Sequence, residues 1–109
     1  MLATKRHIDI APRDMDTLTE LLRKQLPGRD VLAFGSRVTG NAKQFSDLDL
    51  AILGEEPIPA AALASLGDAL DESNLPFKVD IVDWATTNDS FRRVIERQAV
   101  QLLPHSPSQ

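Results

Sequence analysis

Hydrophobic residues recur along this chain in segments that alternate between helical spacing and short continuous runs. The first segment begins at Asp14, ends at Pro27-Gly28, and places its apolar positions on one face of a helix: Met15, Leu18, Leu21, Leu22 and Leu26. The run 30–35 that follows is short, apolar and bounded by glycines, which predicts a buried strand. A polar segment separates it from a second predicted strand at 47–53.

The second half of the chain repeats this alternation. A second helix is predicted before Pro76, with apolar residues at helical spacing: Leu63, Leu66 and Leu70. Residues 77–84 form a third predicted strand, in which Val79 and Ile81 alternate with polar neighbours. A last helix is predicted from a final apolar stripe: Phe91, Val94, Ile95 and Leu102.

The order helix, strand, strand, helix, strand, helix predicts an α/β or α+β fold. We expect a small mixed β-sheet that helices cover on one face, with the other face partly open for a functional site. The 109 residues suffice for a single domain, 1–109, with one modest core. Both ends, 1–11 and 104–109, are predicted to be flexible, and they contain His7 and His105.

Composition and charge narrow the possible functions. The formal net charge of −4 argues against direct binding of this chain to DNA or RNA, because an acidic surface gains little from counterion release. There are no cysteines, which excludes disulfides and thiolate metal sites. Neither a signal peptide nor a membrane-spanning run can be identified, so a cytoplasmic protein is expected.

Aspartates on two predicted strands are the residues that indicate chemistry. Asp47 and Asp49 are two apart, so their side chains leave the same face of a strand while the intervening leucine faces the core. Carboxylates about 4 Å apart repel by roughly 4 kcal/mol at an effective dielectric near 20, so a cation or proton is needed between them. Asp80, flanked by apolar residues on the third strand, is the natural third ligand. Because Mg²⁺ prefers oxygen ligands, these three residues are predicted to be catalytic and metal-binding.

Three carboxylates can hold two Mg²⁺ ions. One ion would bridge the oxygens of a nucleoside triphosphate such as ATP. The other would lower the pKa of an acceptor hydroxyl and stabilise in-line displacement at the α-phosphorus. The third carboxylate is also a candidate general base.

A Gly-Ser pair at the end of the first predicted strand provides a candidate phosphate site. Gly35 lets the backbone approach a ligand closely, because it has no Cβ. If Ser36 opens a short helix, the free N–H groups of that helix and the Ser36 hydroxyl would face an anion. Arg37 either faces a phosphate or pairs with a surface carboxylate. We therefore take Gly35, Ser36 and Arg37 as the candidate nucleotide-binding residues.

Each motif alone has a simpler reading. An Asp-x-Asp pair is more often a solvated strand end, and only its conjunction with Gly-Ser and a mid-strand Asp is specific. Asp83 lies on the opposite face of the third predicted strand from Asp80, and it is expected to cap a turn. Ser46 is expected to orient a turn. Trp84 would stack on a nucleobase or be buried against a partner or the core. A structural Ca²⁺ site is disfavoured because three carboxylates provide too few of its six to eight ligands.

The combined motif resembles the signature of the minimal nucleotidyltransferases, which belong to the DNA polymerase β-like superfamily. Three segments carry the resemblance, in family order and spacing: 35–40 (Gly-Ser-Arg-Val-Thr-Gly), 46–50 (Ser-Asp-Leu-Asp-Leu) and 79–83 (Val-Asp-Ile-Val-Asp). The resemblance implies that Gly35 and Ser36 contact the triphosphate of ATP, that Asp47 and Asp49 bind both Mg²⁺ ions, and that Asp80 completes the site. Thr39 stands where many members have a second Arg.

The resemblance also implies a partner. Members of this two-component type act with a separate all-helical protein of the HEPN type, and in related pairs they silence a HEPN toxin by transferring AMP to it. A chain of 109 residues has no second domain to hold an acceptor, which agrees with a protein partner. The alternatives are a non-catalytic subunit that neutralises its partner by occupying it, and an enzyme that modifies a small hydroxyl compound.

Overall fold

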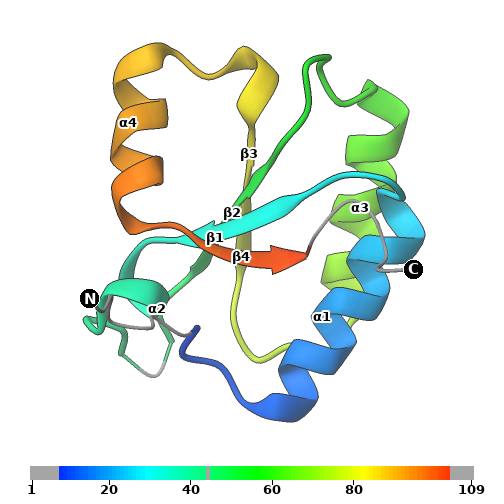
Figure 1. Cartoon of the computed structure of the whole chain (residues 1–109). Helices are drawn as coiled ribbons and strands as arrows, with labels where there is room; N and C mark the ends of the chain where they lie inside the picture. The colour runs from blue at the N-terminus through cyan, green and yellow to red at the C-terminus, as the bar shows by residue number, and fades with distance from the viewer. Residues whose placement is uncertain (1–7, 44, 104–109) are drawn as a thin grey trace, which may run out of the picture.

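A four-stranded mixed sheet forms the centre of the molecule. The computed structural model describes residues 8–43 and 45–103. The sheet has the order β3-β2-β1-β4, built from β1 (Val31–Phe34), β2 (Leu48–Ile52), β3 (Val79–Asp83) and β4 (Val100–Leu103). β1 runs antiparallel to both β2 and β4, whereas β2 and β3 are parallel. The predicted small mixed sheet is therefore confirmed (Figure 1).

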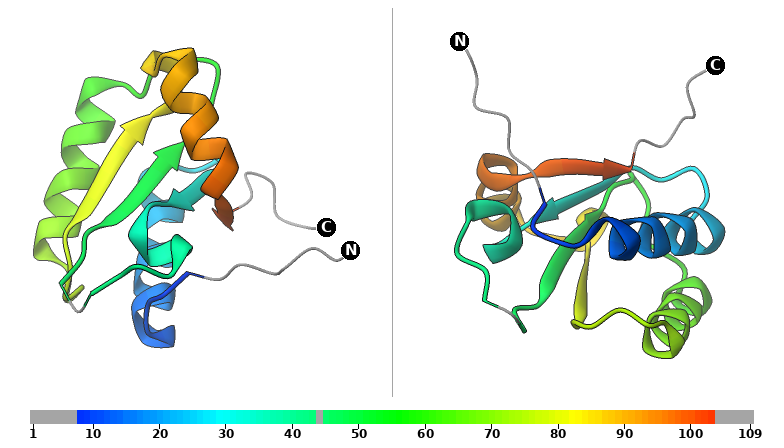
Figure 2. Two further views of the ribbon diagram at one scale, coloured as in Figure 1. Left: turned by 90° about the vertical axis from the view of Figure 1, so that its left-hand side faces the viewer. Right: turned by 90° about the horizontal axis from the view of Figure 1, so that it is seen from below.

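Two helices cover one face of this sheet. α1 (Pro12–Gln25) and α3 (Ala60–Glu72) lie on the same side of it (Figure 2). All the leucines predicted for their apolar stripes pack in this core except Leu63, which is 40% exposed. Seven large side chains of the core are fully buried: Leu18, Leu22, Val31, Leu48, Leu50, Ile52 and Leu66. Burying each such side chain contributes about 1.5–3 kcal/mol. This face supplies most of the hydrophobic stabilisation.

The other face of the sheet is partly covered by α4 (Asp89–Gln98), which differs from the expectation that all helices share one face. Ile95 of α4 is fully buried against Phe34 and Ala51. The reason is that the second face is apolar at one end of the sheet, where it needs a cover. Asp49 and Asp80, which share this face, remain only partly buried.

The last predicted helix is wrong at its C-terminal end. α4 ends at Gln98, and β4 begins two residues later and pairs with β1. Leu102 lies seven residues after Ile95, a spacing that fits a helical stripe and therefore misled the prediction. Val100 and Leu102 instead pack into the core from alternate positions of a strand.

The N-terminal segment is also more ordered than the sequence indicates. Ile8 is buried, Ile10 packs against the core, and the Asp9 backbone N–H donates to the Arg37 carbonyl oxygen at 2.7 Å. α1 then starts at Pro12, two residues before the predicted start, because proline suits the first turn of a helix. The rest of the predicted flexible ends, 1–7 and 104–109, lies outside the described residues, as do His7 and His105. None of the helices in 8–43 and 45–103 could span a membrane.

Candidate functional site

The chain turns sharply at the end of β1. Gly35 has φ 85° and ψ −161°, and the short helix α2 (Ser36–Thr39) starts directly after it. The Gly35 carbonyl oxygen accepts from the backbone N–H groups of Val38 and Thr39, each at 3.0 Å. The phosphate site predicted from the sequence depends on a short helix at Ser36, and this helix is present. Ser36 is thus the first residue of α2, where backbone N–H groups point out of the helix toward any anion.

Two of the predicted carboxylates lie side by side on the face of the sheet that α1 and α3 leave open. Asp49 on β2 is the direct partner of Asp80 on the parallel strand β3. Burial, the nearby charges of Asp80 and Asp47, and a hydrogen bond with Asp80 all raise the pKa of Asp49, burial having the largest effect. The Asp49 side chain also lies against the backbone of Gly35, where a Cβ would overlap Asp49 Oδ2.

Asp47 is more loosely placed than its two partners. It lies one residue before β2 and is exposed, and it acts on Asp49 only through its charge. Lys78 Nζ lies 4.0 Å from Asp80 Oδ1, in an exposed ion pair that contributes little. Within 8–43 and 45–103, no three His, Asp or Glu side chains lie close enough together to hold a metal ion. Asp49 and Asp80 therefore form the centre of the site, and the ligand set that includes Asp47 stays a prediction.

Arg37 is placed differently from the other candidates. Only 7% of it is exposed, and its guanidinium donates from Nε to the Ser46 carbonyl oxygen at 2.9 Å and from Nη1 to the Asp9 carbonyl oxygen at 2.8 Å. The same group lies 4.5 Å from the centre of the Phe77 ring. These contacts join α2 to the N-terminal segment and to the loop before Asp47. Contact between Arg37 and a phosphate, which the sequence predicts, stays a prediction.

Sequence reasoning missed Gln98. Its side-chain oxygen Oε1, at the end of α4, accepts from the backbone N–H of Gly35 at 2.8 Å. The two residues are 63 positions apart, and no pattern in the sequence links a helix-terminal glutamine to a strand-terminal glycine. Only the pairing of β4 with β1 brings them together.

Three side chains that the sequence left with alternatives can be placed. Asp83 caps the short helix η1 (Trp84–Thr86) through the Ala85 N–H at 3.3 Å and accepts from the Ile58 N–H at 2.9 Å, as its parity predicted. Ser46 Oγ accepts from the Lys43 N–H at 2.8 Å, which confirms its turn role. Trp84 packs against the apolar cluster of Phe34, Ala51 and Ile95. The Arg92 guanidinium lies over the Trp84 ring, 5.0 Å from its centre.

Comparisons with known proteins identify the family of this chain. The family described as "Polymerase beta, Nucleotidyltransferase" matches residues 16–107. The chain belongs to this nucleotidyltransferase family. A Haemophilus influenzae protein named probable protein adenylyltransferase MntA is 46% identical over 90 residues, covering 83% of this chain and 79% of that protein.

Solved structures with the same fold extend the comparison. One chain in a toxin–antitoxin structure with AMP-PNP matches this nucleotidyltransferase with TM-score 0.70 and 27% identity, over 83% of this chain and 73% of that chain. A chain in the complex of tri-AMPylated Shewanella oneidensis HEPN toxin with MNT antitoxin matches with TM-score 0.64 and 25% identity, over 84% and 71% of the two chains. The resemblance to the minimal nucleotidyltransferases is confirmed.

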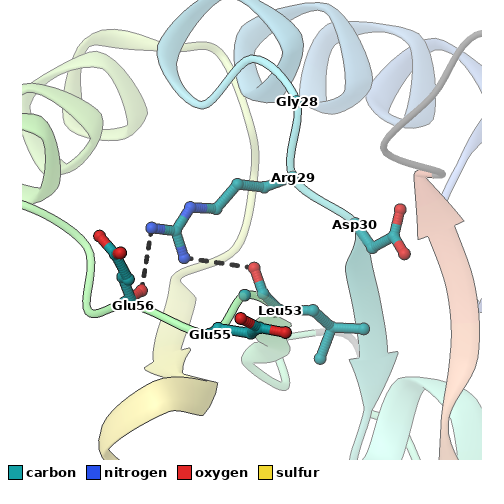
Figure 3. A pocket seen from close by; sticks show the side chains of 7 residues that line it. Gly28, Arg29, Asp30, Leu53, Glu55 and Glu56 are labelled. Atoms are coloured by element: carbon teal, nitrogen blue, oxygen red, sulfur yellow. Dashed lines mark hydrogen bonds between the residues drawn. The ribbon is translucent and has the colours of Figure 1, made fainter.

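A separate pocket of about 590 Å³ lies at the other end of β2 in this nucleotidyltransferase, away from Asp49. Figure 3 shows the Arg29 side chain across it, donating to the carbonyl oxygens of Leu53 at 3.2 Å and Glu56 at 3.0 Å. The guanidinium thus holds the loop that follows β2. With Glu55 and Glu56 also lining this pocket, it is unsuited to a triphosphate.

The contacts of Arg37 make a prediction about stability. Arg37→Ala should lower the free energy of unfolding by about 2–4 kcal/mol, because two charge-assisted hydrogen bonds are lost and backbone oxygens lose their donors. Urea denaturation followed by circular dichroism would measure it. Arg93→Ala, at an exposed position of α4, is the control and should change little. Equal free energies of unfolding for the two variants would contradict a stabilising role for the hydrogen bonds of Arg37.

Proposed function

We propose that this nucleotidyltransferase transfers AMP from ATP to a hydroxyl group on a HEPN-type partner protein. The observation that carries the proposal is the pair Asp49–Asp80 lying directly beside the Gly35–Ser36 turn. The similarity to a probable protein adenylyltransferase, and to a chain in a complex with an AMPylated HEPN toxin, supports AMP as the transferred group and a HEPN protein as the acceptor.

The residues of the site divide the work between them. The backbone and hydroxyl of Ser36, at the start of α2, would bind triphosphate oxygens, and Gly35 allows the phosphates to come close to the carboxylates. Asp47, Asp49 and Asp80 would hold Mg²⁺, because hard oxygen ligands suit this ion. Asp49 and Asp80 are direct cross-strand partners, and the charges of Asp80 and Asp47 add to burial in raising the pKa of Asp49, so a cation here would relieve their repulsion. Two Mg²⁺ ions would supply charge stabilisation at the triphosphate and at the acceptor oxygen. Catalysis is then mainly positioning and electrostatic stabilisation.

An acceptor supplied by another molecule fits the open face of this site. The described residues form one sheet with its covering helices, and they contain no second domain that would enclose an acceptor. The face that carries Asp49 and Asp80 is partly exposed, so a docked protein can bring a hydroxyl to it. This arrangement favours a protein acceptor over a small hydroxyl compound.

The test is AMP transfer in a purified complex with the HEPN-type partner. Incubation with ATP and Mg²⁺ should add AMP to the partner, detected by intact mass spectrometry. Asp80→Asn should lower the rate of AMP transfer by more than about 100-fold. Loss of a metal ligand should exceed the roughly 10- to 100-fold effect that is typical of losing a residue hydrogen-bonded to a ligand. Asp68→Asn, an exposed residue of α3, is the matched control and should transfer AMP normally. An unmodified partner whose activity is still neutralised would instead identify a non-catalytic interaction subunit.

A further inference from the structure

We propose that Gln98 is a positioning residue for the nucleotide site: its side-chain oxygen holds the Gly35 N–H and so fixes the turn that presents Ser36 to the triphosphate. The inference deepens the proposed function and rests on it. The contact is direct, since Gly35 N donates to Gln98 Oε1 at 2.8 Å and both residues are partly buried. The proposal therefore concerns a residue that no sequence motif of the site contains.

The conformation of Gly35 explains why its N–H needs a side-chain acceptor. β1 ends at Phe34, whose partner in β2 is Asp49, so Gly35 lies just beyond the sheet hydrogen bonds. At φ 85° its backbone turns away from the strand direction, and its carbonyl is already used by α2. A partly buried N–H without an acceptor would be costly, which would favour other conformations of the turn. Gln98 removes that cost in the conformation observed.

Gln98 is itself rigidly held relative to the turn. It is the last residue of α4, where the Ala99 N–H donates to the Ile95 carbonyl oxygen at 2.9 Å and ends the helix. Directly afterwards Val100 pairs with Ala33 of β1, two residues before Gly35. The donor and the acceptor are therefore fixed to the same strand, and little entropy is lost when they meet.

The uncharged amide matters as much as the geometry. A glutamate at position 98 would accept the same hydrogen bond, but it would add a negative charge next to the turn. The carboxylate of Asp49 lies against Gly35 with Asp80 beside it, and a triphosphate brings more negative charge to the same place. A neutral acceptor fixes Gly35 without opposing the nucleotide.

The experiment compares Gln98→Leu, Gln98→Glu and wild type, with Gln101→Leu on the exposed side of β4 as the control. NMR hydrogen exchange of the Gly35 amide reports the hydrogen bond, and calorimetric titration with ATP and Mg²⁺ reports nucleotide affinity. In Gln98→Leu the amide should exchange faster and the affinity should fall about 3- to 10-fold, with the melting temperature nearly unchanged. In Gln98→Glu the amide should stay protected while the affinity still falls.

The outcomes separate this inference from the proposed function. Unchanged exchange of Gly35 in Gln98→Leu would overturn the positioning role, as would faster exchange with wild-type affinity for ATP. A fall in affinity that simply follows a fall in melting temperature would also overturn it, because a general packing defect would explain both. Neither measurement requires an acceptor, so failure of AMP transfer to the HEPN-type partner would contradict the proposed function alone.

Discussion

Replacing Asp49 by Asn is expected to abolish AMP transfer and, in the absence of Mg²⁺, to raise the melting temperature of the chain. The loss of activity should exceed about 100-fold, because Asp49 is the predicted ligand nearest both Asp80 and the phosphate turn. The gain in stability follows from the raised pKa of Asp49, which burial and two nearby negative charges cause. An asparagine side chain has the same shape but no charge, so it removes both the cost of burying a charge and the repulsion from Asp80 and Asp47.

The pH dependence provides an independent check of the same substitution. A carboxyl whose pKa is raised on folding destabilises the folded state once it is ionised. The stability advantage of Asp49→Asn should therefore be absent below the ordinary pKa of 3.8, grow as pH rises above it, and be complete above the raised folded pKa. Thermal denaturation from pH 3 to pH 8 would measure it, with Asp68→Asn as the control. A variant less stable than wild type at neutral pH would contradict the expected repulsion.

Gly35→Ala is expected to reduce AMP transfer by about 100-fold or more, because displacement of a catalytic group by about 1 Å can have that effect. A Cβ at position 35 would overlap Asp49 Oδ2, so the carboxylate or the turn must move. The substitution also forces a side chain into a backbone conformation that is essentially restricted to glycine, φ 85° with ψ −161°, which costs roughly 1–3 kcal/mol. Steady-state kinetics with ATP and the partner protein would measure the loss.

Gly40→Ala is the matched control for this prediction. Gly40 ends α2 with φ 90° and ψ 9°, in the left-handed region, so an alanine there is also strained, although less than at Gly35 with its ψ of −161°. A Cβ at that position, however, meets nothing within 4 Å. We expect a smaller loss of melting temperature and near-normal activity for Gly40→Ala. Equal activity of both would mean that the close approach of Gly35 to Asp49 is not needed for catalysis.

The sequence by itself determined the elements of this protein that depend on local pattern. The parity of β2 separates Asp49 from Leu48 and Leu50, because alternate side chains of any strand leave opposite faces. The same rule assigned Asp83 to a structural role. The leucine spacing of α1 and α3 predicted the faces of these helices that pack into the core, with Leu63 as the exception.

Only the tertiary structure decided the features that join distant parts of the chain. α4 lies on the second face of the sheet because Ile95 covers the apolar side chains of Phe34 and Ala51 there. The segment after α4 forms β4 because it pairs with the otherwise open edge of β1.

The Arg37 guanidinium donates to the carbonyl oxygens of Ser46 and Asp9, and these contacts between separate segments cannot be inferred from sequence spacing. The hydrogen bond from the Gly35 N–H to Gln98 cannot be inferred from the sequence either, because the two residues are 63 positions apart. Local periodicity determines on which face of its own helix or strand a residue lies. Contacts between distant segments depend instead on the folded chain as a whole, in which buried polar groups must find hydrogen-bond partners.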